Sequence, residues 1–599
     1  MSHAPDPHVA HAPEPKPAAP AKAPQTVSPE INIFAHTDFR NAKKRFGIKT
    51  DDRRRHMYVI GKTGMGKSTL LENMVINDMW AGHGIGLIDP HGDLAEKILD
   101  FVPPHRVKDV VYFNPADVEF PLGFNILEHI DPDKRHLVAS GLMGVFKKIW
   151  PDVWSARMEY ILNNTILTLL ECHQTTLISI NRLLADKVYR RKAVVKITDP
   201  VVRAFWLTEF DKYSEKYMQE AIAPIQNKIG QFLSASIVRN IVAQKVSTFN
   251  VREIMDQKKI FIVNLSKGRI GEDASRLLGG MLITKIQLSA MERVDQPEED
   301  RKDFFLYVDE FQNFATESFA NILSEARKYR LSLVLANQFI KQLDEKVADA
   351  VFGNVGTLVT YRIGPDDAEL FEREFSPVFL KEDVVDLPKF HIYLKLMIDG
   401  IASQPFSAEI LPPSTNRTHS LAATVASSRK QYGTPRATIE AAVQAWSIGP
   451  AEEDFITTGA ADATRAPELV FGQGAPAYAA AAPVPAGTHA FAPLPPPAPK
   501  KESNLPPPEN WFPAVCGRCG KPTTVPFKPD GSRKIYCKDC YKFRHEDEAP
   551  VAVASVPAPI STQVAGTDAE PAKKKRRRRK KKSNSDSSGL VYDNPSEDR

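Results

Sequence analysis

Short, almost continuous apolar runs recur along residues 31–412, and each run is bounded by turn-forming residues. Such runs are typical of strands that are buried on both faces of a parallel sheet. Helical periodicity separates many of them, which indicates βαβ units. The expected strands are Met57–Ile60, Gly84–Ile88, Val110–Phe113, Ile260–Val263, Phe304–Val308, Leu331–Ala336, Thr357–Tyr361 and Ile392–Met397. The pattern therefore predicts an α/β core.

The alternation of strands and helices stops between about residues 133 and 255. No strand-like run occurs there, and apolar residues such as Met158 and Ile161 recur at helical spacing instead. We therefore expect an all-α domain at 133–255. It would be inserted between two parts of the core, 31–132 and 256–412.

Outside this region, composition rather than periodicity indicates the organisation. Residues 1–30 and 449–510 are rich in Pro and Ala, so we expect a disordered tail and an extended linker. Residues 413–448 have a helical pattern, which could pack on the core or on a neighbouring subunit. A small cysteine module is expected at 511–546, and a disordered tail at 547–599.

The overall composition narrows the class of protein. A chain of 599 residues is too long for one domain, and 42% hydrophobic with 25% charged residues is ordinary for a globular protein. There is no apolar run of about 18 residues and no secretory signal, so we expect no membrane span. Five cysteines are too few for a disulfide scaffold. The ten consecutive cations of Lys573–Lys582 exceed the net charge of +5, so the rest of the chain is mildly acidic.

The strongest chemical signal is a complete GxxxxGK[ST] motif between an expected strand and an expected helix. It reads Gly61-Lys62-Thr63-Gly64-Met65-Gly66-Lys67-Ser68, followed by Thr69. Glycines let backbone N–H groups turn toward phosphate oxygens, and the helix N-terminus adds partial positive charge. We expect Lys67 to reach the β- and γ-phosphates of ATP and Ser68 to contact Mg²⁺.

A second signal is the strand Phe304–Val308, which ends in the paired carboxylates Asp309 and Glu310. In an ATPase this is the Walker B arrangement. Asp309 would then belong to the Mg²⁺ shell, and Glu310 would orient or deprotonate the attacking water. The presence of Glu310 favours a hydrolase over a passive nucleotide binder.

Polar residues near these motifs supply weaker candidates. Gln338 follows the expected strand Leu331–Ala336, where an amide could sense the γ-phosphate or simply face solvent. Arg327, Arg330 and Arg362 could each reach the ATP of a neighbouring subunit, although a surface ion pair is the better interpretation for any single one.

The run Ile88–Asp93 lies at the expected ligand-facing end of the second core strand. Its Pro and Gly could simply make a turn. Its Asp and His residues could instead couple the nucleotide state to neighbouring elements, and both interpretations remain open.

Four of the five cysteines form a metal-ligand pattern. Cys516-x₂-Cys519 and Cys537-x₂-Cys540 are separated by 17 residues, with Asp530-Gly531 at a possible hairpin turn. We expect a structural Zn²⁺ site, because four thiolates close the coordination shell. The fifth, Cys172, is expected to be a buried apolar residue.

The C-terminal segments leave their partners open. The cysteine module has many basic and aromatic residues, which suit nucleic acid, but a protein-docking role is also possible. The run Lys573–Lys582 is expected to bind nucleic acid phosphates, with acidic lipids or a nuclear address as alternatives.

Taken together, these motifs resemble the HerA/FtsK superfamily of ring ATPases, and within it the coupling ATPases of type IV secretion and conjugation. The resemblance covers about 31–412 and rests on Gly61–Ser68, Ile88–Asp93, the helical insert, Tyr307–Phe311 with Gln312 and Asn313, and Asn337-Gln338. It implies an α/β fold with a RecA-like P-loop NTPase core, an inserted all-α domain, a small zinc ribbon and disordered tails.

The resemblance also implies functional expectations. These are a homo-hexameric ring that moves DNA through its channel, with Arg327 as the arginine finger and Gln338 as the γ-phosphate sensor. The helical domain would face a relaxosome or a DNA partner. Membrane-bound coupling proteins carry N-terminal transmembrane helices, whereas this chain has a Pro/Ala-rich tail. We therefore expect a cytoplasmic protein that docks at a secretion channel only through partner proteins.

The leading hypothesis is an ATP-driven DNA translocase of conjugation, type IV secretion or HerA-like DNA processing. One alternative is a secretion ATPase that acts on protein substrates. Another is a slow, nucleotide-gated DNA-binding scaffold. The preferred DNA strand form and the direction of movement do not follow from the sequence.

Overall fold

The computed structural model describes residues 27–38, 43–128, 130–448, 512–525, 528–529, 535–537 and 540. Residues 1–466 and 467–599 form two separate units, and each is considered by itself. Most of the expected N-terminal tail, the whole linker 449–510 and the polybasic run Lys573–Lys582 lie outside the described residues.

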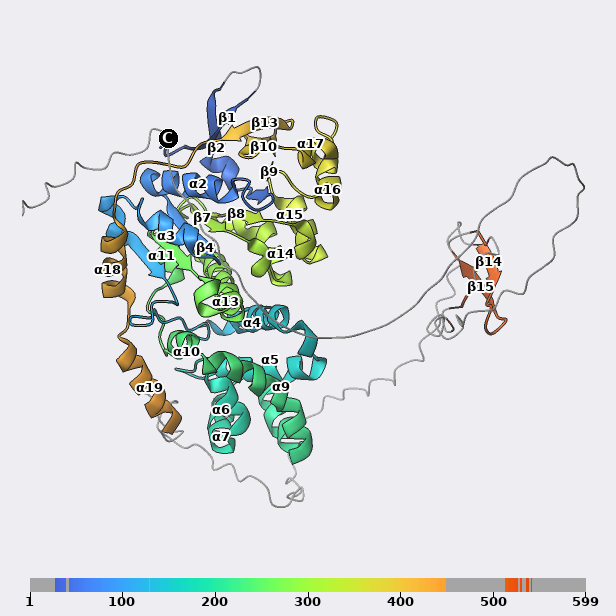
Figure 1. Cartoon of the computed structure of the whole chain (residues 1–599). Coiled ribbons are helices and arrows are strands. Elements are labelled where there is room, and N and C mark those ends of the chain that lie inside the picture. Colours follow the sequence, from blue (N-terminus) through green and yellow to red (C-terminus); the bar gives the residue numbers. More distant parts are fainter. Residues whose placement is uncertain are drawn as a thin grey trace, which may run out of the picture. The chain divides into compact units, whose positions relative to one another are not determined.

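One eleven-stranded sheet organises the first unit (Figure 1), in the order β2-β1-β13-β10-β9-β3-β8-β7-β4-β6-β5. The seven strands from β9 to β5 are parallel, and the other four pair antiparallel. Its strands are β1 (Ile31–Thr37), β2 (Arg45–Lys49), β3 (Met57–Ile60), β4 (Gly84–Asp89), β5 (Val110–Phe113), β6 (Ile260–Asn264), β7 (Phe304–Val308), β8 (Leu331–Asn337), β9 (Thr357–Thr360), β10 (His391–Lys395) and β13 (Phe406–Ile410). The expected α/β class with a mostly parallel sheet is confirmed.

The parallel strands are buried on both faces, which explains their continuous apolar sequences. In β3, Met57 and Val59 belong to one hydrophobic cluster, whereas Tyr58 and Ile60 belong to the other. Helices cover both faces. They are α1 (Thr50–Arg53), α2 (Lys67–Ala81), α3 (Asp93–Leu99), α11 (Val251–Asp256), α12 (Lys267–Ile270), α13 (Glu272–Met291), α14 (Glu317–Glu325), α15 (Glu345–Asn354), α16 (Pro365–Phe375) and α17 (Lys381–Val385).

The expected run Ile392–Met397 is divided in the structure. Strand β10 ends at Lys395, and the small hairpin β11 (Met397–Ile398) and β12 (Ile401–Ala402) follows it. Strands β1, β2 and β13 were not expected, because their polar and apolar residues mix more than in the parallel strands.

Between residues 132 and 256 the described residues contain helices and no strand. They are α4 (Arg135–Ile149), α5 (Ala156–Glu171), α6 (Ser179–Ala185), α7 (Lys187–Lys196), α8 (Pro200–Ala204), α9 (Glu215–Ser234) and α10 (Ser236–Val242), with short helical turns between them. Figure 1 shows this insert below the sheet, with α4 next to α13. Cys172 is buried there, as expected, and burial raises the pKa of its thiol to about 12.

The insert meets the core where two glycines let α4 and α13 approach closely. A Cβ atom at Gly141 would lie 2.5 Å from Cγ2 of Thr284, and one at Gly280 would lie 3.0 Å from Val145. The α4–α13 contact is therefore specified by small residues on both helices.

The C-terminal helices α18 (Leu421–Tyr432) and α19 (Arg436–Ile448) run along one side of the same chain (Figure 1). The Ser428 hydroxyl accepts a hydrogen bond from Tyr112 N on the edge strand β5, at 2.9 Å. Farther along, Arg182 of the insert lies over the Trp446 ring and donates to the Trp446 carbonyl at 3.0 Å. Residues 413–448 thus pack on their own core and insert.

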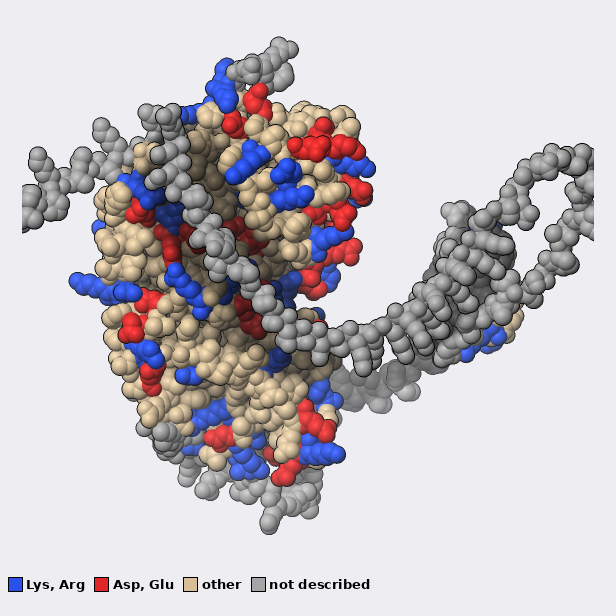
Figure 2. Space-filling model, viewed as in Figure 1, with Lys and Arg blue, Asp and Glu red and all other residues tan. Residues whose placement is uncertain are grey.

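Two further features concern the charge of the surface and the hydrophobicity of the helices. In Figure 2 acidic side chains gather over α16 and α17, whose sequences are PDDAELFEREF and KEDVV. Within the described residues, no helix is both long enough and apolar enough to span a membrane.

Candidate nucleotide site and zinc module

The motif Gly61–Ser68 joins β3 to α2 at the carboxyl edge of the parallel strands. Gly64 (φ 78°) and Gly66 (φ 120°) adopt backbone conformations that favour glycine. Lys67 is the first residue of α2, and its Nζ donates to the Gly61 carbonyl at 2.6 Å. Burial lowers the pKa of Lys67, although Glu310 and Asp309 oppose this effect. The Lys67 ammonium is thus held against the backbone of the loop that precedes it.

Three buried carboxylates face this loop. Asp309 and Glu310 follow β7, and Asp89 ends the neighbouring strand β4. Burial raises the pKa of Asp309 to about 7, and Asp89 and Glu310 add to the shift. The Lys67 ammonium opposes this shift and lowers the pKa. The site therefore has an excess of negative charge that a divalent cation would neutralise, so the donor set fits Mg²⁺.

The turn after β4 also borders the site. Asp89 accepts hydrogen bonds from His91 N at 2.8 Å and from Ala95 N at 2.9 Å, and it thereby holds the start of α3. His91 and Asp93 line the same cavity as the P-loop. Within the run Ile88–Asp93, Pro90–Gly92 therefore form the turn that joins β4 to α3, while the coupling role stays a prediction.

Gln338 connects the loop to the Glu310 carboxylate. It follows β8, which lies between β3 and β7 in the sheet. The Thr63 hydroxyl donates to its Oε1 at 2.9 Å, and its Nε2 donates to Glu310 at 2.5 Å. Gln312 donates to the other oxygen of Glu310 at 2.5 Å. One amide thus spans the place where a terminal phosphate would enter.

The neighbouring amide, Asn337, has a different environment. It is fully buried, accepts a hydrogen bond from the Tyr58 hydroxyl at 2.6 Å and donates to the Phe339 carbonyl at 3.1 Å. These contacts make Asn337 part of the core, and they leave Gln338 as the residue of this pair that faces the cavity.

The P-loop, the carboxylates and Gln338 line one cavity of about 660 Å³. It also contains Lys389 and Phe390, from the segment before β10. Neither residue was predicted from the sequence, and no motif marks them. Only the register of β10, which pairs antiparallel with β9, brings its first residues to the P-loop edge.

The structure separates the three candidate arginines. Arg330 lies 4.0 Å from both Glu298 and Asp303, so it forms the ion-pair arrangement that was the better interpretation for any single arginine. Arg327 is exposed on the turn after α14, does not line the cavity, and has no ion-pair partner among the described residues. Arg362 accepts a hydrogen bond from Lys62 N through its backbone carbonyl. The finger role of Arg327 stays a prediction.

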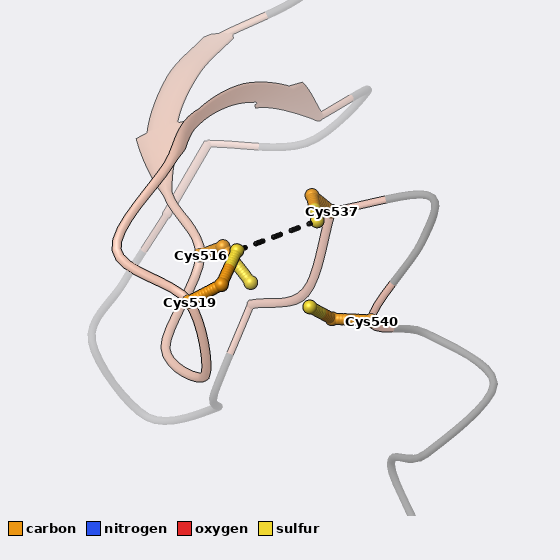
Figure 3. Close-up of side chains that lie close together, drawn as sticks. All are labelled: Cys516, Cys519, Cys537 and Cys540. Carbon is orange, nitrogen blue, oxygen red and sulfur yellow. Dashed lines mark hydrogen bonds between the residues drawn. The ribbon is translucent and has the colours of Figure 1, made fainter.

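The four late cysteines converge in the second unit (Figure 3), where their Sγ atoms all lie within 4.8 Å of one another. The Cys519 and Cys537 sulfurs are 3.7 Å apart. Tetrahedral Zn–S bonds of about 2.3 Å place sulfurs about 3.8 Å apart, so the arrangement fits zinc and not a disulfide. Backbone hydrogen bonds near Cys519 and Cys537 lower the pKa of Cys516 to about 6, which favours the thiolate.

A hairpin carries the first cysteine pair. Strands β14 (Phe512–Val515) and β15 (Pro522–Val525) are antiparallel, and Cys516 and Cys519 lie in their connection. The expected turn at Asp530-Gly531 lies outside the described residues.

Residues 45–374, more than half of the chain, match the model of the type IV secretion-system coupling protein DNA-binding domain. The chain belongs to this family. Residues 509–545 match a second model, described as "Probable treble clef zinc finger". This coupling-type protein thus carries a C-terminal zinc module, as the cysteine spacing predicted.

Solved structures similar to this family member are distant in sequence. Plasmid coupling protein TrwB in complex with ADP and Mg²⁺ is 15% identical, with 67% of this chain and 98% of that chain covered and a TM-score of 0.46. VirB4 of Thermoanaerobacter pseudethanolicus is 16% identical, with 66% and 99% covered and a TM-score of 0.42. No curated protein matches the sequence.

Proposed function

We propose that this chain is an ATP-hydrolysing motor that binds DNA and moves it through a ring of identical subunits. The observation that carries the proposal is the single cavity in which Lys67, Ser68, Asp309, Glu310 and Gln338 meet. Membership in a coupling-protein family described as DNA-binding supports DNA as the partner.

The chain's own groups divide the work of hydrolysis. Backbone N–H groups of Gly61–Thr69 bind the phosphates, and Lys67 exchanges the Gly61 carbonyl for phosphate oxygens. Glu310 orients the attacking water or takes its proton. Bound Mg²⁺ would neutralise phosphate charge, and Ser68 and Asp309 are the residues that would hold it.

Gln338 links nucleotide state to the rest of the protein in this proposal. Its hydrogen bonds to Thr63 and Glu310 span the position of a γ-phosphate, so they must rearrange when one is bound or released. Glu310 is followed by Gln312 and by the segment that leads to α14 and Arg327. Through this segment, a rearrangement at Glu310 would reach Arg327. In the proposed ring, Arg327 lies next to the nucleotide site of the neighbouring subunit.

A ring is supported by the position of Arg327. It is exposed and lies away from the cavity of its own chain, so it could neutralise transition-state charge only at a neighbour's site. We propose a homo-hexamer.

The acidic surface over α16 and α17 disfavours contact of that face with DNA. The insert helix α7, in contrast, has five basic residues and no acidic one. We therefore propose that the insert faces DNA or a DNA-bound partner such as a relaxosome. The protein would work in the cytoplasm and dock at a secretion channel through other proteins.

Steady-state ATPase activity of the full chain, with and without single- and double-stranded DNA, tests this function. We expect DNA to stimulate hydrolysis, and both Lys67→Ala and Glu310→Gln to abolish it. Arg330→Ala is the matched control, because this side chain has acidic partners on the surface. Activity that ignores DNA would favour a motor for protein substrates, and DNA binding without turnover would favour a scaffold.

A further inference from the structure

One aromatic side chain at the nucleotide cavity has no role in the phosphate chemistry. Phe390 lines the cavity together with the P-loop, yet its side chain remains 37% exposed. Among the described residues around this cavity it supplies the one phenyl ring. Tyr361, the other aromatic residue near Gly66, is fully buried and does not line the cavity.

The backbone at Phe390 is held in an unfavourable conformation. Its φ is +69°, a value that bulky residues rarely adopt. Two hydrogen bonds maintain it: Phe390 N donates to the Met65 carbonyl at 3.0 Å, and Ile410 N donates to the Phe390 carbonyl at 3.0 Å. The first bond attaches the aromatic residue directly to the P-loop. Strained residues of this kind are concentrated at ligand sites.

The ring also packs against the loop itself. A Cβ atom at Gly66 would lie 2.9 Å from Cδ1 of Phe390, so the glycine leaves space for the ring. Phe390 precedes β10, and the register of β10 with β9 places this end of the strand at the carboxyl edge of the parallel strands. The ring therefore lies beside the P-loop at the edge of the sheet that binds ligands.

We propose that Phe390 is the stacking platform for the nucleobase, and that stacking makes this site select purine over pyrimidine nucleotides. This inference rests on the proposed function and deepens it. Every base has a π-face, and stacking strength grows with ring area. A single phenyl ring thus favours the two-ring bases.

The exposed face of the ring is available to a base. Nζ of Lys389 lies 4.7 Å from the ring centroid. Lys389 is exposed and has no ion-pair partner among the described residues, so its flexible chain can swing from the ring toward the phosphates. The lysine then exchanges a cation–π contact for a charge-assisted one.

The test compares ligands with and without a base on the full chain in the presence of Mg²⁺. Calorimetric affinities are measured for ADP, UDP and inorganic tripolyphosphate. We expect the wild type to bind ADP more tightly than UDP. Phe390→Leu keeps an apolar contact with Gly66 and removes the ring, and it should weaken ADP binding roughly tenfold. It should leave tripolyphosphate binding unchanged.

Phe390→Trp is the matched variant, which keeps a stacking surface and should retain the preference for ADP over UDP. An equal loss of ADP and tripolyphosphate affinity in Phe390→Leu would overturn the proposal, because the ring would then only support the loop. If the leucine variant does not fold, equal wild-type affinities for ADP and UDP would overturn it without any variant. If the wild type binds none of the three ligands, the ATP site itself is refuted.

Discussion

Replacing Arg53 with methionine should destabilise the nucleotide-binding core far more than the loss of a surface ion pair. Arg53 ends α1 and donates to both carboxylate oxygens of Asp78 on the P-loop helix, at 2.8 and 2.7 Å. It also donates to the Tyr307 hydroxyl on β7 at 2.7 Å. Both charged side chains are 2% exposed. The ion pair thus joins the helix that follows the P-loop to the strand that ends in the Walker B carboxylates.

The size of this loss of stability depends on the hydrogen bonds that the Asp78 carboxylate retains. Removing one partner of a buried ion pair costs about 3–5 kcal/mol, because the other charge stays buried without compensation. Asp78 would retain the Tyr307 hydroxyl at 2.6 Å and the Asn32 amide at 2.8 Å, so we expect about 3 kcal/mol. Arg54→Met is the matched control. Its partner Asp303 is partly exposed, at 17%, and keeps Arg330 at 4.0 Å, so the loss of Arg54 should cost about 1 kcal/mol.

The same ion pair gives a pH dependence. Burial alone would raise the pKa of Asp78, but the Arg53 guanidinium outweighs burial and lowers it. The pair therefore stabilises the fold above the unfolded pKa of about 4, and this stability is lost as pH falls through the folded value. In Arg53→Met the pKa of Asp78 should rise, because the guanidinium is gone. The difference in unfolding free energy from the wild type should then shrink between about pH 7 and pH 5.

Urea unfolding of the full chain, followed by circular dichroism, measures both effects. The double variant Arg53→Met with Asp78→Asn should recover part of the lost stability, because no buried charge remains. An Arg53→Met loss no larger than that of Arg54→Met would refute this reasoning, as would a difference that does not change with pH.

Three further outcomes are expected. Gly141→Val should lower the unfolding free energy by about 1–3 kcal/mol in the same urea assay, because the α4–α13 contact has no space for the side chain; an unchanged midpoint would contradict that packing. Cys516→Ser should reduce the zinc content measured by mass spectrometry without changing the ATPase rate, and full zinc retention would contradict a four-thiolate site. Arg327→Ala should reduce the rate of ATP hydrolysis about 10³-fold, and mixing it with Glu310→Gln subunits should restore activity. The control Arg330→Ala should not reduce the rate, so its mixture has no lost activity to restore. Failure of the mixture to recover would exclude a finger shared between subunits.

The sequence predicted those parts of the fold whose pattern is local. Strand β3 is buried on both faces, and its apolar run predicted both bounds, Met57 and Ile60. Strand β13 lies in the antiparallel part of the sheet, where Ser407 and Glu409 interrupt the apolar pattern, and it was missed. A continuous apolar run predicts a strand that is buried on both faces. In a partly exposed strand polar residues interrupt the run, so the sequence predicts that strand less clearly.

The candidate site divides in a similar way. Lys67 and Glu310 were predicted from local motifs to share one site, and the structure brings them to one cavity. Phe390 was missed, since only the pairing of β10 with β9 brings it to the P-loop. Gln338 was chosen over Asn337 only through the family resemblance, because the residue pattern does not distinguish the two amides. Their roles separate only in the structure, where the Tyr58 hydroxyl holds Asn337 in the core.

The measurement that tests the central claim most directly is ATP-driven movement along DNA. Displacement of streptavidin from biotinylated single- and double-stranded DNA is followed for the full chain and for Glu310→Gln. The proposed motor should displace streptavidin from one strand form in the presence of ATP and Mg²⁺, and Glu310→Gln should bind the same DNA without displacement. Hydrolysis that is stimulated by DNA but displaces streptavidin from neither form would contradict translocation.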